Sequence, residues 1–80
     1  MSTYLTHARH HADKIEHYYA HAGAAGYMQA RHHELELEKL LQRAHRSKSG
    51  KGDVPVIQAI LEGVRPKMAE MKKRESSGDT

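Results

Sequence analysis

Apolar residues recur at helical spacing in three stretches of this chain, and glycine-containing connections separate the stretches. These stretches predict helices over residues 3–22, 27–46 and 54–73. No segment alternates polar and apolar residues over a useful length, so we expect no sheet. The sequence therefore predicts an all-α fold, with one helical domain over residues 1–74 and a disordered tail over residues 75–80.

The first connection, Gly23-Ala24-Ala25-Gly26, is short and flexible. Gly23 suits the left-handed backbone conformation that commonly ends a helix. A connection of this length favours an antiparallel hairpin of the first two helices. The alternative is that Ala24 and Ala25 continue the helix, which would produce one long rod.

The second connection, residues 47–52, contains serine, lysine and glycine and is predicted to be a flexible basic loop. Asp53 is placed to cap the third helix, and Pro55 falls in its first turn, where a missing N–H is tolerated. Pro66 interrupts the third helix, but the apolar spacing keeps its phase beyond it. We therefore expect a kink at Pro66 and not a helix end.

A chain of 80 residues buries only about 60–65% of the surface that its unfolded form exposes. The absence of cysteine removes disulfides as a source of stability, and the chain also lacks Phe and Trp. Met28 and Leu35 fall opposite the main apolar face of the second helix. We therefore expect self-association or a protein partner to complete the fold.

These features predict a small, non-enzymatic protein–protein interaction module that acts through apolar helix faces. It would be an adaptor, inhibitor or regulator of a larger protein, or a homodimer, and it would need no cofactor. The chain resembles small accessory proteins of phages and mobile elements in general style only, and no specific residue carries that likeness. The predicted partner-binding residues are Met28, Leu35, Ile60, Leu61, Val64, Met68 and Met71, with Tyr18 as an aromatic anchor.

Several classes of protein are disfavoured by the sequence. His33-Glu34 would begin a metalloprotease motif, but the required second histidine is replaced by Leu37. No serine lies in a nucleophile elbow, and cysteine is absent. No window approaches 18 apolar residues and no signal peptide is visible, so we expect a cytoplasmic protein without a membrane span.

Nucleic-acid binding is an alternative function, because basic residues gather in two places. Acidic residues such as Glu62, Glu70 and Glu75 dilute this basic character. The candidate phosphate-binding residues are Arg43, Arg46, Lys48 and Lys51 near the second connection, and Lys67, Lys72, Lys73 and Arg74 in the second half of the third helix.

Metal binding is a further alternative, because the chain contains eight histidines. Two pairs have a spacing of four residues, which places both imidazoles on one helix face. These candidate ligands are His7 and His11, and His17 and His21. The competing interpretation is that they are solvated surface histidines without a third ligand.

His33 differs from the other histidines, because it shares a helix face with Ala30 and Leu37. It is predicted to be a core histidine that is hydrogen-bonded to a neighbour. The alternative is a buried switch whose protonation loosens the packing. By contrast, the acidic residues at positions 34, 36 and 38 are predicted to form a solvated helix face.

Overall fold

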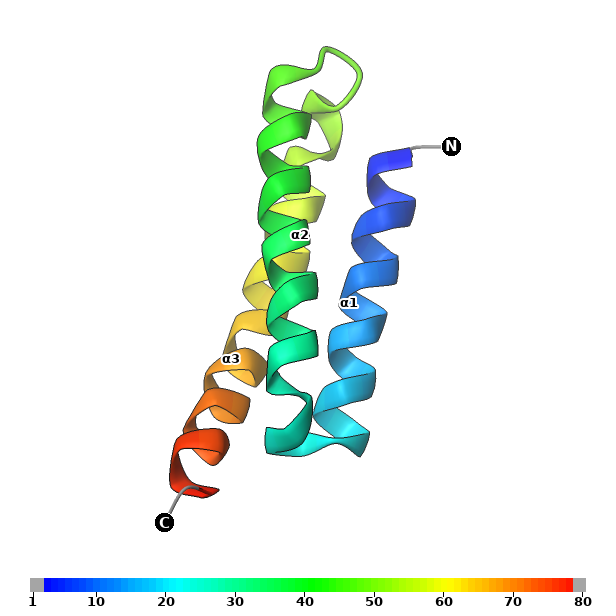
Figure 1. Ribbon diagram of the computed structural model, residues 1–80. Helices are drawn as coiled ribbons and strands as arrows, with labels where there is room; N and C mark the ends of the chain where they lie inside the picture. The colour runs from blue at the N-terminus through cyan, green and yellow to red at the C-terminus, as the bar shows by residue number, and fades with distance from the viewer. Residues whose placement is uncertain (1–2, 79–80) are drawn as a thin grey trace.

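The computed structural model describes residues 3–78. It has three α-helices, α1 (Thr3–His21), α2 (Tyr27–Arg46) and α3 (Val54–Gly78). A 3-10 turn, η1 (Gly23–Gly26), joins the first two helices, and a second, η2 (Lys51–Asp53), precedes α3. The helices run side by side, down, up and down (Figure 1), in a rod of 48 × 17 × 16 Å. The predicted all-α fold is confirmed, since residues 3–78 contain no strand.

The predicted hairpin of α1 and α2 is present. Gly23 ends α1 with a φ of 55°, a backbone conformation that residues other than glycine rarely adopt. The residues between Gly23 and Gly26 form a 3-10 turn and do not continue the helix. Helices α1 and α2 begin and end close to their predicted limits, because the apolar spacing and the glycines both mark the ends.

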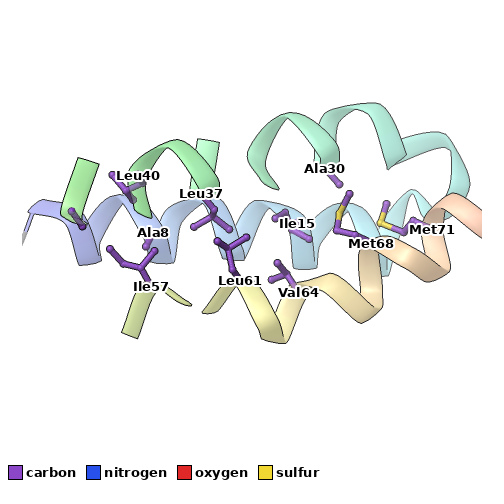
Figure 2. Packing of buried hydrophobic residues seen from close by; sticks show 11 residues of the cluster. Ala8, Ile15, Ala30, Leu37, Leu40, Ile57, Leu61, Val64, Met68 and Met71 are labelled. Atoms are coloured by element: carbon purple, nitrogen blue, oxygen red, sulfur yellow. The ribbon is translucent and has the colours of Figure 1, made fainter. Parts of the chain in front are cut away.

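All three helices contribute to one core along the axis of the rod (Figure 2). The buried residues of α3 are spaced four, three, four and three residues apart. This spacing keeps one stripe facing two neighbouring helices and is typical of helix bundles. The buried apolar residues are Ala8 and Ile15 from α1; Ala30, Leu37, Leu40 and Ala44 from α2; and Ile57, Leu61, Val64, Met68 and Met71 from α3.

The stripe on α3 was expected to contact a partner, and the structure places it in the core instead. Leu61, Val64, Met68 and Met71 are all less than 5% exposed, and Ile60 is half-buried against the same cluster. The hairpin of α1 and α2 covers the stripe, so these residues offer no surface to another molecule. Only Met28 and Leu35, together with Val56, are large apolar residues that stay exposed among residues 3–78.

Helix α3 is longer than predicted. It is continuous through Pro66 and extends to Gly78. Residues 75–78 of the predicted disordered tail are therefore helical, while residues 79–80 lie outside the described part of the chain, as do residues 1–2. The missing N–H at Pro66 removes one hydrogen bond, but Met68 and Met71 beyond it remain in the core and hold the helix in register.

The second connection is an ordered turn and not the flexible loop that its composition suggested. The backbone N–H groups of Gly50 and Lys51 both donate to the carbonyl oxygen of Ser47, at 3.2 and 3.1 Å. The N–H of Asp53 donates to the Gly50 carbonyl at 2.9 Å. Gly50 itself is buried against the end of α2. These hydrogen bonds set the angle at which α3 returns along the hairpin.

Candidate functional site

The most exposed large apolar residue among residues 3–78 lies on the outer side of α2. Met28 is 72% exposed, and Leu35, two helical turns further on, is 41% exposed. His32 lies between them on the same side, because residues three and four apart are neighbours on a helix surface. Exposing a methionine to this extent leaves apolar area in water that a contact with another molecule would remove.

A hollow of about 400 Å³ adjoins Met28. Tyr18 from α1 forms one wall, and the remaining walls come from α2. The lining residues are Tyr18, Met28, Gln29, His32 and His33. We call these five residues and Leu35 the docking face. It brings together three of the predicted partner-binding residues, namely Tyr18, Met28 and Leu35.

Four histidines meet across the groove between α1 and α2, beside the docking face. We call them the histidine seam: His10, His11, His32 and His33. The Nδ1 atoms of His11 and His33 are 2.8 Å apart, so one of them donates a hydrogen bond to the other. Ring centroids are 5.1 Å apart for His11 and His33, 5.5 Å for His10 and His11, and 5.4 Å for His32 and His33.

Two physical effects favour the neutral form of the central pair of the seam. Burial lowers the pKa of both His11 and His33 below the ordinary histidine value. Neighbouring positive charges lower these pKa values further, with His10 the largest such contributor for His11 and His11 for His33. The carboxylate of Glu36 acts in the opposite direction on the pKa of His11.

The structure revises the two expectations for His33. It is half-buried at the edge of the core and not inside it. It does have the hydrogen-bonding neighbour that was predicted, His11, which lies 22 residues earlier in the chain. Its ring also lies nearly parallel to that of Tyr18, with centroids 6.2 Å apart and an interplanar angle of 25°. His33 therefore belongs to both the histidine seam and the docking face.

Glu34 was expected to lie on a solvated face, but it is buried in the structure. It is 6% exposed and forms an ion pair with Arg31. It packs beside Tyr27 and Met68, next to a second, more polar hollow. The position falls at the margin of the apolar stripe, one turn from both Ala30 and Leu37, which explains its burial.

The histidine pairs considered for metal binding do not converge. His11 belongs to the seam and His7 lies one helical turn before it on α1, whereas His17 and His21, with ring centroids 4.8 Å apart, lie at the hairpin end of α1. Over residues 3–78, no group of three or more histidine, aspartate or glutamate side chains is arranged to hold a metal ion. The metal alternative thus has no assembled site in this part of the chain.

The two basic groups considered for nucleic-acid binding lie at opposite ends of the rod. Arg43, Arg46, Lys48 and Lys51 surround the end of α2, and the 67–74 group lies in the C-terminal half of α3 (Figure 1). Lys67 of that group forms an ion pair with Glu16. Arg74 also forms an ion pair with Glu70. The two groups therefore do not combine into one continuous basic surface. No helix in residues 3–78 combines the length and apolar character required to span a membrane.

Comparisons with protein families, with curated proteins and with solved structures find no match for this chain.

Proposed function

We propose that this chain is a non-enzymatic protein–protein interaction module and that its docking face pairs with a second copy of the chain. One observation carries the proposal: a largely exposed methionine, Met28, stands beside a hollow walled by an aromatic ring, Tyr18. In a two-fold symmetric dimer the same patch meets itself. Each Met28 would then enter the hollow of the other copy and contact Tyr18, a favourable sulfur–aromatic pairing.

The charges of this face support the pairing of two copies. Burial and the neighbouring histidines lower the pKa of His33, so its ring adds little repulsion between two copies at about pH 7.5. Further along α2, Lys39 and Glu36 lie 3.7 Å apart and offset each other. Leu35 extends the apolar contact from Met28 along the helix. Two antiparallel α2 helices would place the Met28 of one copy near the Leu35 of the other.

The proposal is tested by the solution mass, measured by light scattering with size exclusion at about pH 7.5 in the presence of a chelator. We expect about twice the chain mass of 9.1 kDa. Leu35→Asp and Met28→Asp should produce a folded monomer. Val56→Asp is the matched control, because Val56 on α3 is 41% exposed, as Leu35 is, but lies outside the docking face.

A monomer at high protein concentration, or equal loss of the dimer in the Leu35→Asp and Val56→Asp variants, would overturn the proposal. A dimer that dissociates on addition of chelator would show that metal ions bridge surface histidines, and it would also contradict the apolar docking mode.

A further inference from the structure

The position of His33 couples the histidine seam to the shape of the docking face. Its ring lines the hollow, stacks beside Tyr18 and accepts or donates the hydrogen bond with His11. If the contact with His11 breaks, His33 loses the hydrogen bond that orients its ring. The wall of the hollow that would receive Met28 of the second copy then changes shape.

The hydrogen bond between His11 and His33 survives the addition of one proton to the pair but not of two. When both rings are neutral, one Nδ1–H donates to the lone pair of the other Nδ1. One additional proton leaves that arrangement intact, since an imidazolium can donate to a neutral imidazole. A second additional proton puts hydrogen on both Nδ1 atoms, so that two positively charged donors face each other at 2.8 Å. The two rings must then separate.

The surroundings of the pair make that separation more favourable in acid. His7, His10 and Lys14 on α1 and His32 on α2 are the neighbours that are positive or become positive. Glu36 on α2 is the one acidic group that acts on His11 among these neighbours. As the pH falls through the histidine range, positive charge therefore accumulates on both sides of the groove between α1 and α2.

We propose that the His11–His33 contact is a proton-sensitive contact that holds the docking face in its binding shape, so that two copies pair at neutral pH and separate below about pH 6. This inference rests on the proposed function for its readout, but the contact itself lies within one chain. Acid separates the rings, His33 leaves the wall of the hollow, and the seat for the Met28 of the second copy is lost.

The experiment measures the dimer dissociation constant by light scattering or sedimentation at about pH 7.5 and about pH 5.5, with chelator present. We expect the dissociation constant of the unmodified chain to rise at least about tenfold. This is the change per pH unit in an equilibrium constant when dissociation is coupled to the uptake of one proton. The double variant His11→Gln with His33→Gln keeps hydrogen-bonding side chains that do not titrate, and its constant should change less than about threefold over the same range.

The matched control is His17→Gln with His21→Gln. These histidines are also neighbours on α1, but they lie outside the seam and the hollow. This control should respond to acid as the unmodified chain does. An unchanged constant in the unmodified chain would overturn the inference. The same would follow if the His11→Gln/His33→Gln variant kept the full response, because the response would then come from charge elsewhere.

A second measurement keeps the inference testable if the chain does not pair. Urea unfolding of the monomer at the two pH values should show that acid destabilises the unmodified chain and the His17→Gln/His21→Gln variant more than the His11→Gln/His33→Gln variant. Failure to pair at neutral pH would thus refute only the proposed function. Equal acid sensitivity of all three monomers would refute the proton-sensitive contact.

Discussion

Replacing Gly50 by alanine should destabilise the fold, because the added methyl group has no room. A Cβ at Gly50 would lie 2.8 Å from the Cα and 3.0 Å from the carbonyl oxygen of Ala44, and 3.1 Å from Cε2 of Tyr4. Carbon atoms in favourable contact are about 3.5–4.0 Å apart. The ring of Tyr4 can shift, but the backbone at Ala44 is the last turn of α2 and cannot move without disturbing the hydrogen bonds that end it.

The size of the effect follows from two opposing contributions. Overpacking of this kind costs about 1–3 kcal/mol. Exchanging glycine for alanine also reduces the entropy of the unfolded chain, which stabilises the fold by about 0.4–1 kcal/mol. We therefore expect Gly50→Ala to lower the free energy of unfolding by about 1–2 kcal/mol. For a domain of this size that corresponds to a melting temperature lower by roughly 5–15 °C.

Gly52→Ala provides the matched control, since a Cβ at Gly52 would meet nothing within 4 Å. Its φ is not positive, so alanine is unstrained there and should raise the melting temperature by a few degrees. The assay is thermal unfolding followed by circular dichroism, with all three proteins at one concentration. If the melting temperature of Gly50→Ala equals or exceeds that of Gly52→Ala, the second connection does not pack on the end of α2 as described.

Two further predictions concern the core and a contact between α1 and α3. Leu61→Ala should lower the free energy of unfolding by about 2–5 kcal/mol, because Leu61 is 1% exposed. Val56→Ala, at a position that is 41% exposed and outside the docking face, should change it by less than about 0.5 kcal/mol. Similar urea midpoints for the two variants would contradict the assignment of the core. The hydroxyl of Tyr19 donates a hydrogen bond to the carboxylate of Glu70 and lowers the pKa of that group. The contact therefore stabilises the fold at pH values above the ordinary glutamate pKa, and this stabilisation is lost as the pH falls below that value. Tyr19→Phe should therefore reduce the loss of stability between about pH 5 and pH 3, and an acid-unfolding curve that matches the unmodified chain would argue against it.

The helices could be predicted from the sequence because their signals are local. Helical spacing of apolar residues defines each buried face, and Gly23 and Pro55 mark an end and a beginning. The end of α3 could not be placed in this way, since residues 75–78 carry no apolar residue that would mark a buried face. The burial of Glu34 was missed for a related reason: a charged residue at the margin of an apolar stripe is buried only if a partner, here Arg31, is in reach.

The histidine seam could be predicted only in part. The position of His33 on an apolar face indicated that it would have a neighbour, but not which residue that would be. His11 and His33 are 22 residues apart, and their meeting depends on how α1 and α2 are aligned along their length. That alignment is set by the turn at Gly23 and by side-chain packing in three dimensions. The i, i+4 histidine pairs, which are visible in the sequence, are a property of one helix and do not reveal contacts between helices.

The burial of the α3 stripe also decides which variants can report on binding. An apolar stripe shows that a helix face is covered, but it does not show whether the cover comes from the same chain. Here α1 and α2 supply it, so a charge at Leu61 or Met68 would unfold the bundle and would abolish any interaction indirectly. Met28 and Leu35 lie on the far side of α2, where a charge leaves the core intact. Loss of pairing in folded variants at these two positions is therefore the evidence that separates a binding surface from a stabilising core.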